Sequence, residues 1–100
     1  MKDLYQIGIG PERLVSAELR PYHKGWMISQ IIKPVDASND ENLDFEIIKE
    51  IILDADNEGV ILYLGDLVWH RHGTNRYVYL GFQVYSGVPR RRPEYQGRVT

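Results

Sequence analysis

Residues 59–87 read GVILYLGDLVWHRHGTNRYVYLGFQVYSG, and this stretch carries the strongest fold signal in the 100-residue chain. Two apolar or aromatic runs, 60–64 and 67–72, are separated only by Gly65 and Asp66, and a two-residue Gly-X loop is typical of a type II′ hairpin turn. A second glycine-containing turn follows, and the run after it alternates apolar and polar residues with the period of a strand. The stretch therefore predicts three consecutive antiparallel strands.

Two or three further strands are predicted ahead of this stretch. Residues 13–20 and 26–33 alternate in the same way, and residues 21–25 have the composition of a hairpin loop between them. Residues 4–9 also alternate and are followed by Gly10-Pro11, which cannot continue a strand ladder. We expect this first segment to be an edge strand.

One amphipathic helix is predicted between the two groups of strands. Its apolar residues recur at three- and four-residue spacing and are Leu43, Ile47, Ile48, Ile51, Ile52 and Ala55. Asp40 or Asn42 can act as the N-cap, and Gly59 can follow the last turn. The predicted fold class is therefore α+β, an antiparallel sheet of five to six strands with one helix packed on one face, in the order β-β-β-α-β-β-β.

The chain is expected to form one domain followed by a tail. Its 100 residues, 43% of them hydrophobic, are enough for one modest core. Residues 1–87 are the predicted α+β domain, and residues 88–100 are predicted to be an extended or disordered C-terminal tail rich in arginine and proline. The absence of cysteine excludes disulfides and thiolate zinc sites, and the N-terminus lacks the apolar centre of a signal peptide. We expect a cytoplasmic protein.

Acidic residues are concentrated on the predicted helix, although the formal net charge is only −2. Glu46, Glu50 and Asp54 follow one another at four-residue spacing, where like charges destabilise an isolated helix by a few tenths of a kcal/mol per pair. We call these three residues the acidic ridge. It is either a solvated face or a surface that docks on a basic partner.

The predicted sheet face away from the helix is rich in tyrosine. Strand alternation gathers on this face Ile61, Tyr63, Val68, His70, Tyr77, Tyr79 and Tyr85. Tyrosine is enriched at interfaces because it provides a large contact area and a hydroxyl group. The alternatives are that the N-terminal strands cover this face, that a homodimer buries it, or that a partner binds it.

Arg90, Arg91 and Arg92 lie between two prolines at the start of the predicted tail. Arginine binds phosphate groups and tyrosine stacks on bases, so single-stranded nucleic-acid binding is the alternative function. The negative net charge and the acidic segment 36–58 oppose the approach of a polyanion.

His70 and His72 are the residues on which a metal site would depend. Two residues apart on a strand they share a face, and His23 or Asp66 can supply a third ligand. A small metal-dependent enzyme is therefore the second alternative. The chain has no dinucleotide-binding loop and no serine in a nucleophile elbow, and we expect neither catalysis nor a cofactor.

The pattern favours a non-catalytic protein-binding module, a small inhibitor or adaptor that docks on a basic surface of a macromolecular partner. Inhibitors made by phages or mobile elements have this general size and charge pattern. The residues predicted to bind the partner are Glu46, Glu50, Asp54, Tyr63, His70, Tyr77, Tyr79, Tyr85, Arg90, Arg91 and Arg92. No membrane contact is expected, and the chain is expected to be a monomer or a homodimer.

Overall fold

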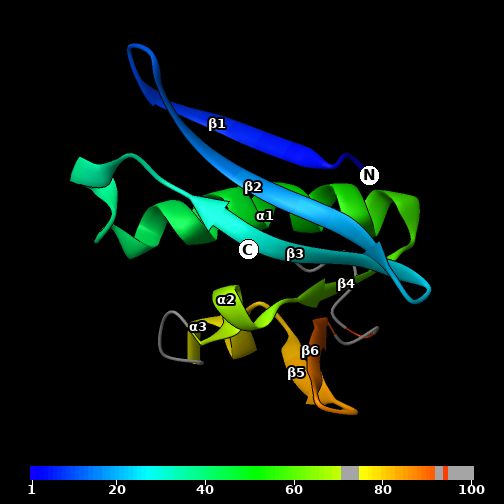
Figure 1. Ribbon diagram of the computed structural model, residues 1–100. Coiled ribbons are helices and arrows are strands. Elements are labelled where there is room, and N and C mark those ends of the chain that lie inside the picture. The colour runs from blue at the N-terminus through cyan, green and yellow to red at the C-terminus, as the bar shows by residue number, and fades with distance from the viewer. Residues whose placement is uncertain (71–74, 92–93, 95–100) are drawn as a thin grey trace.

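A computed structural model describes residues 1–70, 75–91 and 94. In chain order its elements are β1 (Leu4–Gly10), β2 (Arg13–Tyr22), β3 (Gly25–Ile32), the 3₁₀ turn η1 (Val35–Ala37), α1 (Glu41–Glu58), β4 (Ile61–Leu64), α2 (Asp66–Trp69), α3 (Asn75–Tyr79), β5 (Phe82–Tyr85) and β6 (Val88–Arg91). The strands form one sheet in the order β1-β2-β3-β4-β6-β5, and α1 packs against it (Figure 1). The predicted α+β class and the order β-β-β-α-β-β-β are confirmed.

The sheet is mixed rather than wholly antiparallel. β3 and β4 pair in parallel, whereas the other neighbouring strands pair antiparallel. The reason is that α1 connects β3 to β4, and a helical crossover returns the chain in the same direction. Gly25 lies opposite Ile61 at this junction, where an added Cβ would sit 1.9 Å from the Ile61 carbonyl oxygen. Only glycine allows the two backbones to approach this closely.

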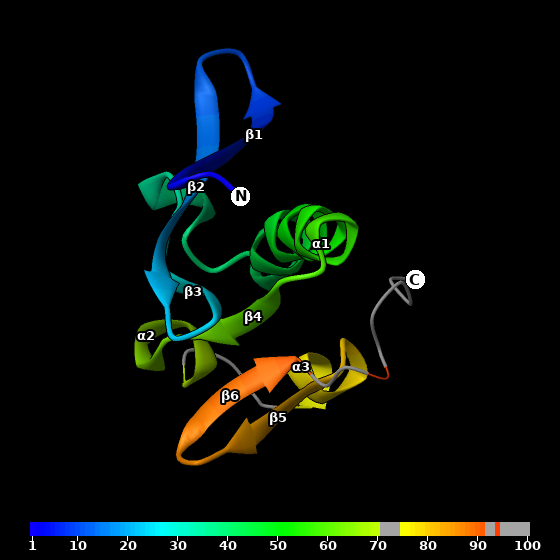
Figure 2. The same cartoon turned by 90° about the vertical axis from the view of Figure 1, so that its right-hand side faces the viewer.

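The helix α1 forms where its sequence predicts. Asp40 is the N-cap and accepts a hydrogen bond from the Asn42 N–H at 3.1 Å, and Gly59 ends the helix with φ 68°. The core residues that α1 contributes are Phe45, Ile47, Ile48, Ile51, Ile52 and Ala55. Figure 2 looks nearly along α1 and shows the sheet curving around it, with β1 and β2 above and β6 and β5 below. Among the described residues, no helix combines the length and the apolar character needed to cross a membrane.

A buried ion pair fixes the start of α1 against the end of β3. Lys33 Nζ lies 2.6 Å from Asp44 Oδ1, and the two side chains are 1% and 0% exposed. Lys33 Nζ also donates to the Asp40 carbonyl at 3.0 Å. Two charges removed from water in this way are tolerated because each compensates the other.

The prediction of a strand over residues 67–72 is wrong where the structure describes them. β4 ends at Leu64, and the Gly65 carbonyl then accepts hydrogen bonds from the N–H groups of Val68 and Trp69 at 3.0 and 2.9 Å, which starts α2 instead of a type II′ turn. Val68 and Trp69 are adjacent and both buried, whereas neighbouring strand residues point to opposite faces. Residues 71–74, which include the predicted second turn, lie outside the described residues.

The third predicted strand is a helix at its start. Tyr77 and Leu80 are buried three residues apart, while Val78 and Tyr79 between them are exposed, which is the period of a helix. The Tyr77 hydroxyl donates to the Val68 carbonyl at 3.0 Å and so joins α3 to α2. Of this third predicted strand, only the part that forms β5 has strand conformation in the structure.

The sheet continues past Gly87. β6 inserts between β4 and β5, with Arg90 opposite Tyr63 on one side and opposite Gln83 on the other. The first four residues of the segment expected to be a tail, Val88–Arg91, therefore belong to the sheet. Residues 92–93 and 95–100 lie outside the described residues.

Candidate functional site

The strand β1 has one edge that no described segment pairs with. The Asp3 carbonyl accepts a hydrogen bond from the Leu19 N–H of β2 at 2.8 Å. This bond shows which residues of β1 face β2 with their main-chain groups: Asp3, and then every second residue after it. In an antiparallel ladder, residues that bond to the neighbouring strand alternate with residues whose N–H and C=O groups point away. The outward-pointing residues of β1 are Leu4, Gln6 and Gly8.

The sequence of β1, LYQIGIG, contains no charged residue. Exposed edge strands of soluble proteins usually carry charges, prolines or bulges that prevent pairing with other chains. In β1 the register is irregular only between Gly8 and Gly10, so Leu4–Ile7 is a regular strand. This part of β1 is able to accept a further strand.

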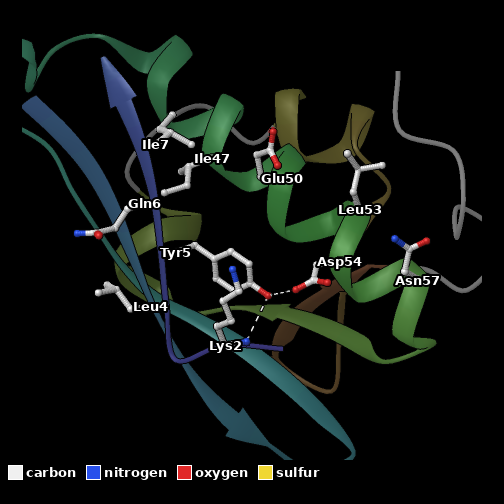
Figure 3. A pocket seen from close by; sticks show the side chains of 10 residues that line it. All are labelled: Lys2, Leu4, Tyr5, Gln6, Ile7, Ile47, Glu50, Leu53, Asp54 and Asn57. Carbon is white, nitrogen blue, oxygen red and sulfur yellow. Dashed lines mark hydrogen bonds between the residues drawn. The ribbon is translucent and has the colours of Figure 1, made fainter. Parts of the chain in front are cut away.

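A groove of about 590 Å³ lies between β1 and α1 (Figure 3). It is lined on the β1 side by Lys2, Leu4, Tyr5, Gln6 and Ile7, and on the α1 side by Ile47, Glu50, Leu53, Asp54 and Asn57. We call it the edge groove. From Ile47 to Asn57 the helix rises about 15 Å at 1.5 Å per residue. This length matches about five residues of extended chain.

Tyr5 ties β1 to α1 inside the edge groove. Its hydroxyl donates to the Asp54 carboxylate and accepts a hydrogen bond from the Lys2 N–H at 3.3 Å (Figure 3). Burial, followed by the hydrogen bond to Asp54, raises the pKa of Tyr5 to about 12. Tyr5 therefore remains a neutral donor at physiological pH and holds Asp54 against β1.

The acidic ridge is divided between two roles. Glu46 and Glu50 are exposed, whereas Asp54 is half-buried and bound to Tyr5. Of the two exposed acids, Glu50 lines the edge groove. The groove also contains Lys2, whose Nζ lies 5.4 Å from the centre of the Tyr5 ring. Because Glu50 is exposed and lines the groove, it is the ridge residue best placed to meet a basic group that enters the groove.

The tyrosine-rich face predicted from strand alternation is formed only in part, because residues 75–79 are helical. Tyr77 is fully buried, and its ring centroid lies 5.0 Å from that of Phe45 and 5.6 Å from that of Trp69. Tyr79 is 89% exposed on α3, and His70 is exposed at the end of α2. Tyr77 is therefore part of the core and not available to a partner.

Tyr63 and Tyr85 line a hollow of about 250 Å³ on the sheet face away from α1. The other residues that line it are Tyr22, His23, Ser86 and Val88. Of these four, only His23 was predicted to have a functional role, as a third metal ligand. The Tyr22 ring centroid lies 4.9 Å from that of Tyr63 and 4.3 Å from that of His23. We call this site the aromatic hollow. The only local signal for it was the aromatic and basic loop that follows β2.

Arg90 and Arg91 are neighbours on β6 but lie in opposite environments. The Arg90 guanidinium carbon is 4.1 Å from the centre of the Tyr85 ring, on the face with the aromatic hollow. Arg91 is 6% exposed; its Nη1 lies 2.5 Å from Asp56 Oδ1, and its Nε donates to the Leu80 carbonyl at 2.8 Å. Strand alternation explains the difference, and it makes Arg91 a core residue.

Within residues 1–70, 75–91 and 94, no three His, Cys, Asp or Glu side chains are grouped so that they can hold a metal ion. His70 follows a helix instead of lying on a strand, and His72 is outside the described residues. The metal-enzyme alternative depended on a strand over residues 67–72, and the described residues 66–69 are helical instead. Arg92, the remaining predicted binding residue, is also outside the described residues.

Comparison of the chain with protein-family models, with curated proteins and with solved structures finds no match.

Proposed function

We propose that the protein is a non-catalytic protein-binding module that captures an extended segment of a partner in the edge groove. The observation that supports this function is the uncharged edge of β1, with which no described segment pairs, beside a helix wall that carries Glu50. A strand that joins a free sheet edge gains main-chain hydrogen bonds, and the neighbouring side chains give selectivity. By occupying such a segment, the module acts as an inhibitor or an adaptor.

The chemistry of the groove defines the partner segment. About five extended residues fill the length of the α1 wall. Leu53, which is 50% exposed, offers an apolar contact, and Glu50 offers a carboxylate in the same wall. The preferred segment therefore combines an apolar side chain with a lysine or arginine. Electrostatic attraction to Glu46 and Glu50 also increases the rate of encounter with a basic partner.

A second copy of the chain is a less suitable occupant of this edge. Antiparallel pairing of β1 with its own copy places the two α1 helices on the same face of a continuous sheet, related by a two-fold axis. Glu46 and Glu50 of one copy then face the same residues of the other. Like charges in this arrangement oppose association.

The test uses linear peptides that are selected from a random library for binding to the full chain. Their affinities are measured by calorimetry. Gln6→Pro removes an outward N–H and leaves the ladder with β2 intact, because the Gln6 N–H does not bond to β2. We expect this variant to weaken peptide binding about tenfold or more, since it removes one hydrogen bond and obstructs the strand edge. Gln6→Ala keeps the N–H and is expected to bind normally.

A second pair of variants tests the role of charge. Glu50→Gln is expected to weaken the binding of the selected basic peptides and to reduce the salt dependence of that binding. Glu12→Gln makes an equal change of charge at an exposed turn and is expected to change neither quantity. Equal peptide affinity in Gln6→Pro and the parent protein would refute strand addition. So would a dimeric parent protein that Gln6→Pro converts to a monomer, because a second copy would then occupy the edge.

A further inference from the structure

The sheet face away from α1, which we call the outer face, carries a row of side chains across four strands. Arg20 on β2 lies opposite Met27 on β3, Met27 opposite Tyr63 on β4, and Tyr63 opposite Arg90 on β6. The residues of β4 next to Tyr63, Leu62 and Leu64, are buried in the core. The row therefore points away from α1.

The aromatic hollow lies along this row. Its volume of about 250 Å³ is below the roughly 300–1,000 Å³ of sites for drug-sized ligands, so it fits one ring system. Tyr22 and Tyr63 form one side of it, with ring planes inclined by 57°. Tyr85, which is 60% exposed, contributes a third ring. A hollow lined by aromatic rings favours a planar ring as its ligand.

Two arginines stack on rings of the hollow, and a lysine lies in the neighbouring turn of the chain. The guanidinium carbon of Arg20 lies 5.8 Å from the centre of the Tyr22 ring, Arg90 lies over Tyr85, and Lys24 is in the same turn as His23. In the described part of the chain none of these three cations forms an ion pair with a carboxylate.

A guanidinium stacked on a ring still presents N–H groups in its own plane, and these bind phosphate oxygens. Arg20 uses one of them in a contact of 3.6 Å with the Met27 sulfur. Two acidic residues lie close to Arg20: Glu18, two positions earlier on β2, and Asp66, which lines an adjacent hollow together with Arg20.

We propose that the outer face binds single-stranded nucleic acid, with one base stacked in the aromatic hollow and the neighbouring phosphates held by Arg20 and Arg90. Aromatic platforms flanked by cations bind single strands in this way, and a base paired in a duplex cannot enter such a hollow. The acidic ridge, which would repel a polyanion, lies on α1, on the other side of the sheet. The edge groove and the outer face can therefore be occupied together.

The test is fluorescence anisotropy of the full chain with labelled 12-nucleotide single strands of DNA and RNA at low salt. An abasic strand of the same length is the control for charge attraction without stacking. We expect the strands with bases to bind more tightly than the abasic strand. Tyr85→Ala is expected to weaken binding about tenfold, the usual effect of removing one stacking ring. Tyr79→Ala removes an exposed tyrosine outside the hollow, 89% exposed against 60% for Tyr85, and is expected to have no effect.

A second comparison tests the phosphate contacts. Arg20→Gln is expected to weaken binding and to make it less dependent on salt. Arg13→Gln removes an arginine from the same strand, one that is already paired with Asp36 at 2.6 Å, and is expected to change binding less. The proposal is overturned by the absence of binding to both strands, by equal binding of the abasic strand, or by equal effects of Tyr85→Ala and Tyr79→Ala. Displacement of the strands by polyglutamate at equal charge would also overturn it. None of these results depends on the edge groove.

Discussion

Removal of the Arg91 side chain is expected to destabilise the fold strongly, although the sequence predicts the same partner-binding role for Arg91 as for Arg90. Arg91 Nη1 lies 2.5 Å from Asp56 Oδ1, the two side chains are 5% and 12% exposed, and Arg91 Nε donates to the Leu80 carbonyl. Arg91→Ala removes the cation from a nearly buried carboxylate. Breaking one partner of a buried ion pair costs about 3–5 kcal/mol. A domain of this size has a total stability of about 5–15 kcal/mol.

Urea unfolding followed by circular dichroism measures this effect, with Arg90→Ala as the matched control. Arg90 is half-buried and stacks on Tyr85, so its loss is expected to cost about 1 kcal/mol or less. With a urea dependence of about 1–3 kcal/mol per molar, Arg91→Ala lowers the midpoint by roughly 2 M. Combining Arg91→Met with Asp56→Ala is expected to recover part of the loss, because no unpaired buried charge remains. Equal midpoints for Arg91→Ala and Arg90→Ala would refute the assignment of Arg91 to the core.

Two further predictions concern Tyr5 and Gly25. An alkaline absorbance titration is expected to show Tyr5 ionising near pH 12, a step absent from Tyr5→Phe. Because an unfolded tyrosine ionises near pH 10, the stabilisation from neutral Tyr5 is complete below pH 10 and is lost between pH 10 and 12. The stability difference between the parent and Tyr5→Phe should shrink over that range, and a constant difference would contradict the prediction. Gly25→Ala is expected to cost about 1–3 kcal/mol in urea unfolding, because its Cβ would meet the Ile61 carbonyl at 1.9 Å. Gly8→Ala, whose Cβ has no atom within 4 Å, is the control, and an equal loss in both would argue against a close contact at Gly25.

The helix α1 was predictable because its signals are local. The stripe from Leu43 to Ala55 has a single period, and Asp40 and Gly59 have the chemistry of the two caps that they form. The alternation in β2 was equally informative, since Val15, Ala17 and Leu19 are all buried. In these segments local preference and tertiary packing agree.

Residues 66–69 and 75–79 were mispredicted because tertiary packing overrides local preference there. Valine, tyrosine and tryptophan favour strands, and a run of six residues cannot separate a strand from a helix by period alone. The core instead takes the adjacent pair Val68 and Trp69, together with Tyr77 from the next helix. No local feature of the sequence shows that these three side chains converge.

The candidate sites were only partly predictable for a similar reason. Glu50 was identified from charge spacing, but the edge groove also needs the position of β1 at the edge of the sheet beside α1. The aromatic hollow combines Tyr22 from one hairpin with Tyr85 from another, more than sixty residues later in the chain. Their proximity depends on the parallel pairing of β3 with β4 and on the insertion of β6.

Amide hydrogen exchange by NMR of the full chain, with and without a selected basic peptide, tests the strand-addition function most directly. In the free protein the N–H groups of Leu4, Gln6 and Gly8 are expected to exchange rapidly, and those of Tyr5 and Ile7 slowly, because only the latter bond to β2. The peptide is expected to protect the first group. Protection of these amides in the free protein, or unchanged exchange when the peptide is bound, would contradict the proposal that the edge of β1 is the binding site.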